Sequence, residues 1–205
     1  WPFRWRRQPP ELAQDVLHPA RWWTVVRAAF LDRDGVLNRA IVRDGRPYAP
    51  RKLDDFAILP GVPEAVRRLK AAGYVVIVAT NQKDVGTGLV SQAVIDAMHA
   101  KLSAAMPIDE IRVCTCIDEC PCYKPNPGML LDAARDWNVD LTASVMIGDR
   151  WRDIGAGRNA GCLTIFIDWG YAEALPIKPD LTAIDLVDAV DQLLSPPFNH
   201  HGNTR

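Results

Sequence analysis

Apolar and polar residues alternate along the middle of the chain with two different periods. Short apolar runs, such as Tyr74 to Thr80 and Leu163 to Ile167, are separated by longer segments in which apolar residues recur at helical spacing. A near-continuous apolar run of this length is typical of a strand covered on both faces. The pattern predicts strands at 25–32, 74–80, 111–114, 144–147 and 163–167, and helices at 63–73, 91–106, 127–137, 153–160 and 182–194.

The alternation of strands and helices predicts an α/β fold: a Rossmann-like, three-layer sandwich with a central parallel sheet. Ligands of such sheets bind at the carboxyl ends of the strands. The segments between these strand ends leave room for a flap and a loop but not for a separate cap domain. We therefore expect an open site whose specificity is set by segments 42–50 and 83–88 and by a cysteine-rich loop at 114–122.

Composition and charge narrow the class of protein. The chain has 205 residues, of which 48% are hydrophobic and 24% charged, so one globular domain with an ample core is expected. A net charge of -1 gives no general attraction to nucleic acid or to anionic membranes. No apolar run approaches the roughly 20 residues that cross a bilayer. These features favour a cytoplasmic protein with a small substrate.

The two ends of the chain differ from the predicted domain at 25–195. Segment 1–24 carries Trp1, Trp5, Trp22 and Trp23, and we expect an arm that packs on the domain or on a partner subunit, so that a monomer and a homodimer both stay open. A membrane-surface role is the alternative for this arm. Segment 196–205 is polar and is interpreted as a tail.

Polar residues of complementary kinds follow four of the predicted strands. They are Asp32 and Asp34, Thr80 and Asn81, Lys124, and Asp149 with Asp153. Carboxylates gathered at one place repel one another, so such a cluster indicates a bound divalent cation, and magnesium prefers oxygen ligands. Gly35 permits the sharp turn that follows the first pair.

These residue types suit phosphoryl transfer. An ionised Asp32 is a competent nucleophile toward phosphorus, and Asp34 is placed to act as the general acid and base. Lys124 would offset negative charge, while the Thr80 hydroxyl and the Asn81 main-chain N–H would hold phosphoryl oxygens.

The motifs D-x-D-G-V-L-N, T-N-Q, K-P-x-P-G-M and G-D-R-x-x-D resemble, in order, those of the haloacid dehalogenase-like phosphatases, over roughly Phe30 to Asp168. The resemblance implies a magnesium-dependent phosphomonoesterase that works through an aspartyl-phosphate. It also implies that Asp32, Asp149 and the main-chain carbonyl of Asp34 ligate magnesium. Asp153 would act on the metal or on Lys124 from outside the ligand set.

Four cysteines stand directly before Lys124 as C-x-C-x3-C-x-C. Cys114, Cys116, Cys120 and Cys122 fit a structural zinc site made of thiolates, with disulfides as the alternative. Four protein ligands would leave no position for a catalytic water. The fifth cysteine, Cys162, is interpreted as a buried apolar residue.

A cysteine loop in this place resembles the branch of the family (subfamily IIIA) that includes heptose bisphosphate and histidinol-phosphate phosphatases. Members of this branch usually carry His where Cys116 stands, and the heptose enzymes commonly carry arginines where this chain has Thr87 and Tyr123. Arginine is the usual bidentate phosphate clamp. Lys83, Arg150 and Arg152 are therefore candidates to replace those two arginines, and Asn81, Lys83, Tyr123 and Arg150 form the predicted substrate-binding set.

The resemblance favours D-glycero-D-manno-heptose 1,7-bisphosphate or a related sugar phosphate as the substrate. Histidinol phosphate is the close alternative. A nucleic-acid 3′-phosphatase would be expected to present a basic surface, which the net charge does not support. A hypothesis of another class is a zinc-stabilised binding module without turnover.

Overall fold

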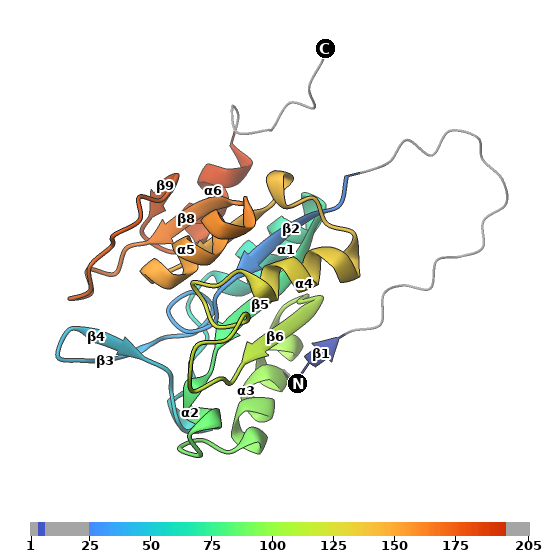
Figure 1. Ribbon diagram of the computed structural model, residues 1–205. Helices are drawn as coiled ribbons and strands as arrows, with labels where there is room; N and C mark the ends of the chain where they lie inside the picture. Colours follow the sequence, from blue (N-terminus) through green and yellow to red (C-terminus); the bar gives the residue numbers. More distant parts are fainter. Residues whose placement is uncertain (1–3, 7–24, 196–205) are drawn as a thin grey trace, which may run out of the picture.

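The computed structural model describes residues 4–6 and 25–195, and most of the described chain is organised around one seven-stranded sheet (Figure 1). Its strand order is β1-β6-β5-β2-β7-β8-β9. All neighbouring strands are parallel except β1, which runs antiparallel to β6 at one edge. The strands span Arg4–Arg6 (β1), Arg27–Leu31 (β2), Tyr74–Asn81 (β5), Glu110–Cys114 (β6), Val145–Gly148 (β7), Leu163–Ile167 (β8) and Leu181–Ala183 (β9).

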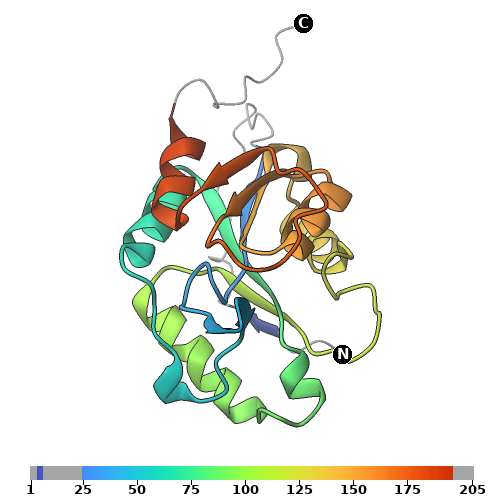
Figure 2. The same cartoon turned by 90° about the vertical axis from the view of Figure 1, so that its left-hand side faces the viewer.

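Helices cover both faces of the sheet, as the view along the sheet in Figure 2 shows. The first face is covered by α1 (Val62–Ala71), α3 (Gln92–Ala105) and α6 (Leu186–Leu194). The second face is covered by α4 (Gly128–Trp137) and α5 (Trp151–Ala160). Shorter helices are η1 (Leu53–Asp55), α2 (Lys83–Gly86) and η2 (Leu141–Ala143). The predicted three-layer α/β fold is confirmed.

Side chains of β2 divide between two apolar cores because successive residues of a strand point to opposite faces. Ala29 and Leu31 belong to the core under α1, α3 and α6, whereas Ala28 and Phe30 belong to the core under α4. All four are fully buried. Burial on both faces explains why this strand is an apolar run and not an alternating one.

The described segment between β2 and α1 contains a β-hairpin. This hairpin is a flap and not a separate domain. Strands β3 (Ile41–Arg43) and β4 (Arg46–Tyr48) pair antiparallel. The two residues between them, Asp44 and Gly45, both have positive φ, of 49° and 71°. A two-residue Asp-Gly turn of this kind matches the twist of the strands that it joins.

The predicted helix at 182–194 is wrong in its first turn. Residues Leu181–Ala183 form the edge strand β9, and α6 begins only after Asp185. The Oδ1 atom of Asp185 accepts a hydrogen bond from the Asp188 N–H at 2.8 Å and thereby caps the helix. An N-cap residue has extended backbone, so the helix cannot continue backward through it.

The predicted arm and tail lie mainly outside the described residues. Within the arm, Arg4–Arg6 pairs with β6 in the register Arg4 to Arg112. The remaining tryptophans of the arm and all of 196–205 are not among the described positions. None of the described helices combines the length and the apolar character that crossing a membrane requires.

Replacing Asp185 by Ala is expected to lower the free energy of unfolding by about 1 kcal/mol, because the first turn of α6 loses its cap. Urea denaturation followed by circular dichroism measures this. Asp185→Asn is the matched control, since Asn retains a side-chain oxygen that can accept the bond. Equal losses in the two variants would contradict the capping role.

Candidate active site

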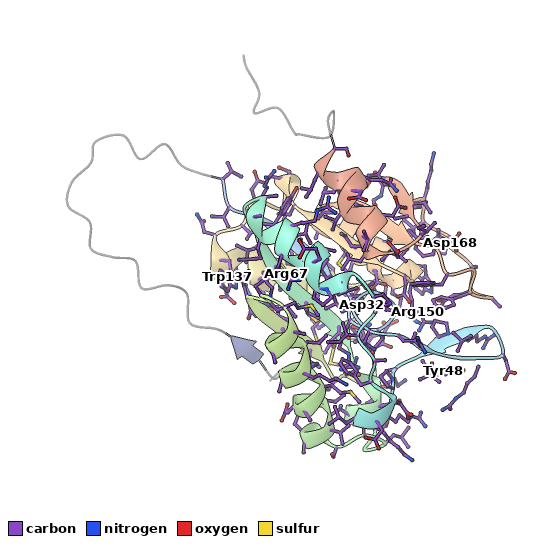
Figure 3. All side chains as sticks on the ribbon, turned by 180° about the vertical axis from the view of Figure 1, so that it is seen from behind. Asp32, Tyr48, Arg67, Trp137, Arg150 and Asp168 are labelled. Carbon is purple, nitrogen blue, oxygen red and sulfur yellow. A yellow bond between two sulfur atoms is a disulfide. The ribbon has the colours of Figure 1, made fainter. Side chains whose placement is uncertain are left out.

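Most of the polar residues predicted to meet at the strand ends line one cavity of about 310 Å³, although Thr80 and Asp149 do not. Figure 3 shows Asp32 and Arg150 near one another at this end, with Tyr48 on the neighbouring hairpin. The cavity is lined by Asp32, Asp34, Ala40, Arg46, Pro47, Tyr48, Ala49, Asn81, Gln82, Lys83, Asp84, Tyr123, Lys124, Arg150, Arg152 and Asp153. Parallel topology explains the convergence, since all these strands end at the same edge.

Lys124 is the buried cation of the site, with a relative exposure of 1%. Its Nζ lies 2.9 Å from Asp32 Oδ1 and 2.6 Å from Asp153 Oδ1, and donates to the Ala79 carbonyl at 2.7 Å. Burial opposes the charge of the amine, but Asp153 and Asp32 outweigh this effect and raise the pKa of Lys124. The side chain therefore stays protonated and joins two acidic residues from different elements.

Asp149 stands out because it is buried and has no such cation. Neither of its carboxylate oxygens forms a hydrogen bond of ordinary geometry with the described residues, and its exposure is 1%. Burial is the main cause that raises its pKa well above the usual range, and the charges of Asp32 and Asp153 raise it further. The neighbouring Tyr171 side chain lowers the pKa of Asp149.

Oxygens of Asp32, Asp149 and Asp153 lie within 4.8 Å of one another. Burial is the main cause that raises the pKa of Asp32 to about 6; the charge of Lys124 lowers this pKa, and the charges of Asp153 and Asp34 raise it. A Cβ on Gly35 would lie 1.8 Å from Asp149 Oδ2, so the turn after the first acids leaves room for this carboxylate only as glycine. Unpartnered buried oxygens in a group of acids fit a divalent cation with oxygen ligands.

Asp153 differs from Asp149 in its partners. Its Oδ1 contacts Lys124, and its Oδ2 accepts the main-chain N–H of Arg150 at 3.0 Å. Both oxygens are therefore engaged by protein. This leaves Asp149 and Asp32 better placed than Asp153 as direct ligands of a cation.

Asp34 is held by three donors that the sequence prediction missed. Arg33 contacts both of its carboxylate oxygens at 2.9–3.2 Å, Asn38 donates to Oδ1 at 2.9 Å, and Gln82 donates to Oδ2 at 2.8 Å. Arg33 is fully buried, and its Nη1 lies 3.2 Å from the Nε2 of His99 on α3. Burial and the charge of Arg33 lower the pKa of His99 to about 3, so the ring is neutral and can accept this bond.

Thr80 and Asn81 are next to one another at the end of β5, but only Asn81 lines the cavity. Thr80 is 1% exposed and does not line the cavity, and its hydroxyl accepts a hydrogen bond from Gln82 at 2.9 Å. The Asn81 side chain accepts from the Lys124 N–H at 3.1 Å and donates to the Lys124 carbonyl at 3.2 Å. Asn81 thus also fixes the backbone that carries the lysine.

All four predicted substrate-binding residues line the cavity: Asn81, Lys83, Tyr123 and Arg150. Arg150 is engaged elsewhere, because its guanidinium contacts both carboxylate oxygens of Glu173 at 2.8 and 2.6 Å. Thr87 is not a lining residue, and its hydroxyl donates to the Asp84 carbonyl. Of the two positions at which the heptose enzymes commonly carry arginine, Tyr123 therefore lines this cavity and Thr87 does not.

Two contacts join the loop after β8 to the site. Trp169 Nε1 donates to the Gly35 carbonyl at 2.8 Å, and the Ala172 N–H donates to the Gly45 carbonyl at 2.8 Å. The first contact supports the turn after the nucleophile candidate, and the second anchors the tip of the hairpin. Neither contact has a signal in the sequence. The hairpin turn does have one, the Asp44-Gly45 pair.

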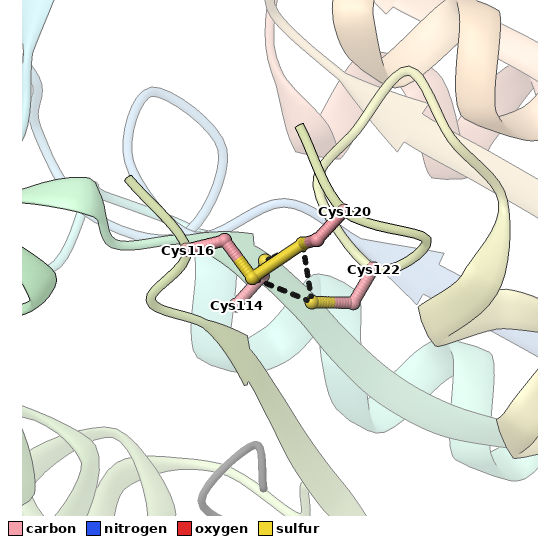
Figure 4. A group of neighbouring side chains, drawn as sticks. All are labelled: Cys114, Cys116, Cys120 and Cys122. Carbon is pink, nitrogen blue, oxygen red and sulfur yellow. Dashed lines mark hydrogen bonds between the residues drawn. A yellow bond between two sulfur atoms is a disulfide. The ribbon is translucent and has the colours of Figure 1, made fainter. Parts of the chain in front are cut away.

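The four cysteines of the loop before Lys124 gather as predicted (Figure 4). One ligand atom from each lies within 4.8 Å of the others, and Cys120 Sγ is 3.2 Å from Cys122 Sγ and 3.5 Å from Cys114 Sγ. Cys116 and Cys120 are joined by a disulfide, while Cys114 and Cys122 are free. Burial is the main cause that raises the pKa of the Cys114 thiol to about 12.

A sequence model of the haloacid dehalogenase-like hydrolases matches residues 27–161. The chain belongs to this family. Its relatives include a D-glycero-D-manno-heptose-1,7-bisphosphate 7-phosphatase of Thermosynechococcus vestitus, 35% identical over 80% of this chain and 93% of the relative. The enzyme of Bordetella bronchiseptica named D-glycero-beta-D-manno-heptose-1,7-bisphosphate 7-phosphatase is 34% identical over 82% of this chain and 98% of that protein.

A solved structure of the D,D-heptose 1,7-bisphosphate phosphatase from B. bronchiseptica, complexed with magnesium and phosphate, superposes with a TM-score of 0.71. Its sequence identity is 34%, and the match covers 82% of this chain and 98% of that one. The predicted membership in the haloacid dehalogenase-like phosphatases is confirmed, and with it the prediction of an enzyme of the phosphatase type. The roles of individual residues stay predictions.

Within this haloacid dehalogenase-like site, replacing Arg33 by Met is expected to lower the free energy of unfolding by about 3 kcal/mol. The substitution leaves Asp34, whose side chain is 14% exposed, without its cation. Arg67→Met is the matched control, because the Arg67–Glu64 pair has side-chain exposures of 53% and 64% and should contribute less than about 1 kcal/mol. Similar losses in both variants, measured by urea denaturation, would contradict a structural role for the buried pair.

Proposed function

We propose that the chain is a magnesium-dependent phosphomonoesterase that hydrolyses D-glycero-D-manno-heptose 1,7-bisphosphate or a related sugar phosphate. The observation that carries the proposal is the ion pair of Asp32 with Lys124 on the cavity, with an oxygen of Asp32 within 4.8 Å of the unpartnered carboxylate of Asp149. The relatives named above, which are heptose bisphosphate phosphatases, favour the substrate. The net charge and the size of the cavity favour a small ester over nucleic acid.

Asp32 is the nucleophile in this proposal. Lys124 contacts its Oδ1, so Oδ2 is the oxygen that we assign to the attack on phosphorus. A bond forms between this oxygen and phosphorus while the bond from phosphorus to the sugar oxygen breaks, which yields an aspartyl-phosphate. Lys124 restrains the carboxylate and offsets part of the negative charge that gathers on the phosphoryl group.

Asp34 is the proposed general acid and base. It gives a proton to the departing sugar oxygen, and later takes one from the water that attacks the aspartyl-phosphate and frees phosphate. To do so, one of its oxygens must exchange a protein donor for the reacting group. Asn38 and Gln82 are neutral donors and the less costly ones to exchange, whereas Arg33 fixes the carboxylate by charge.

Magnesium would be held by Asp32, Asp149 and the main-chain carbonyl of Asp34, with Asp153 outside the ligand set. The fit rests on the two unpartnered oxygens of Asp149 and on the acids that surround it. When bound, the ion would neutralise these acids and the phosphate that approaches them. Asp153 would keep Lys124 in place.

Phosphate release from a panel of esters tests the proposal. With magnesium, the wild-type enzyme is expected to prefer heptose 1,7-bisphosphate over histidinol phosphate and simple sugar phosphates, and to lose turnover with chelator. Asp32→Asn, an isosteric control, should be at least about 1000-fold slower because the nucleophile is lost.

Preference for histidinol phosphate would agree with the proposed mechanism but contradict the proposed substrate. A loss of turnover for every ester, with a folded protein, would instead favour the hypothesis of a zinc-stabilised binding module. Turnover that survives in Asp32→Asn would contradict the nucleophile.

We further propose that the cysteine loop holds structural zinc through Cys114, Cys116, Cys120 and Cys122. A disulfide between Cys116 and Cys120 accounts for two of the sulfurs, but the convergence of all four supports a metal site. Zinc would bind the reduced thiolates and offset the cost of their burial.

Zinc content and melting temperature test this proposal in the protein purified under reducing conditions. Cys114→Ser is expected to lose zinc and to melt at a lower temperature, because one of four ligands is removed. Cys162→Ser is the control, since this buried cysteine lies outside the cluster. Unchanged zinc content and melting temperature in Cys114→Ser would contradict the site.

A further inference from the structure

Arg46 and Arg152 bring two positive charges to the cavity from different elements. Arg46 belongs to the hairpin strand β4 and Arg152 to the first turn of α5, and both line the cavity that contains Asp32 and Lys124. Both also line an adjoining cavity of about 340 Å³, which contains neither Asp32 nor Lys124. The two arginines are therefore neighbours at the margin of the active site, away from the reacting carboxylates.

Among the described residues, neither of these two guanidinium groups is in an ion pair, unlike Arg150, although the charge of Arg152 contributes to lowering the pKa of Glu173. Arg150 lines both cavities as well, but Glu173 binds it through both carboxylate oxygens. Arg152 is placed over the Trp151 ring, 4.9 Å from its centre, a contact that orients the group and leaves its N–H donors available.

The position of Arg46 in the hairpin lowers the local stability of this hairpin. Arg46 is directly opposite Arg43 in the strand register, and like charges in such a pair repel. Arg43 stacks over the Tyr48 ring at 5.8 Å and does not line the cavity, whereas Arg46 does. The repulsion would be relieved if an anion bound beside Arg46.

We propose that Arg46 and Arg152 form a second anion-binding subsite, which receives the distal phosphate of a doubly phosphorylated substrate while the other phosphate reacts at Asp32. This inference rests on the proposed phosphatase function and extends it. Guanidinium groups suit the task because each presents N–H donors in a planar fork that matches phosphate oxygens. The subsite lies on the hairpin and α5, not at Thr87 or Tyr123.

The test compares two substrates that share the reacting phosphate. The value of kcat/KM is measured for heptose 1,7-bisphosphate and for heptose 7-phosphate, and their ratio reports the contribution of the distal phosphate. In Arg46→Ala and in Arg152→Ala this ratio is expected to fall about tenfold, mainly through a higher KM for the bisphosphate, because a charged hydrogen bond is lost. Arg46→Lys should recover part of the loss, since it keeps the charge without the fork.

Arg43→Ala is the matched control, because it removes the same charge from the same hairpin without altering the cavity lining. Its ratio should stay within about twofold of wild type. An unchanged ratio in Arg46→Ala and Arg152→Ala would overturn the subsite, as would equal falls in Arg43→Ala and Arg46→Ala, which would indicate a general field of positive charge.

Calorimetric binding of heptose 1,7-bisphosphate to Asp32→Asn, with and without Arg46→Ala, separates this inference from the proposed function. Weaker binding with Arg46→Ala, in an enzyme whose wild type hydrolyses none of the esters, would support the subsite and overturn the phosphatase proposal. Equal binding beside normal hydrolysis would overturn the subsite alone.

Discussion

The contact on which the rest of the site depends is the buried ammonium group of Lys124 between Asp32 and Asp153. It joins the loop after β6 to the end of β2 and to the start of α5, and its third bond goes to the carbonyl of Ala79 in β5. A buried lysine is costly unless it is paired, and so are the two acids. Each member of the group therefore requires the others, and the strands must end where they do for the three to meet.

Small residues make this concentration of charge possible. Gly148 ends β7 where a Cβ would lie 2.1 Å from the Cβ of Asp153, and Gly35 clears the space that Asp149 occupies. Neither glycine contributes a functional group. Their effect is to let two loops approach the same point, so that acids separated by more than a hundred residues in sequence can act on one small volume.

The sequence predicted the strand-end residues well because the position of a side chain at the end of a parallel strand follows from the order of elements alone. Asp32 and Asp149 converge for this reason, and Lys124 reaches them from the loop after β6. The partners of Asp34 were not predictable, since Gln82 and His99 reach the group through tertiary packing. The pairing of Arg150 with Glu173 was missed for the same reason, because the loop after β8 has no periodic pattern. The start of α6 was misplaced because an apolar edge strand precedes its cap, and a short apolar run does not distinguish strand from helix.

The hydrogen bond from Ala172 to Gly45 has a consequence for how the protein can change over evolutionary time. The groups assigned to bond breaking lie on or beside central elements that also carry the cores, where substitutions disturb folding. The hairpin, in contrast, is fastened at its tip by main-chain atoms, and substitutions other than at Gly45, where a Cβ would lie 2.9 Å from the Cβ of Ala172, leave this bond in place. Residues of β4 can thus vary while the frame persists, and an ancestral enzyme could acquire new substrates by drift in this exposed ribbon without first losing its chemistry.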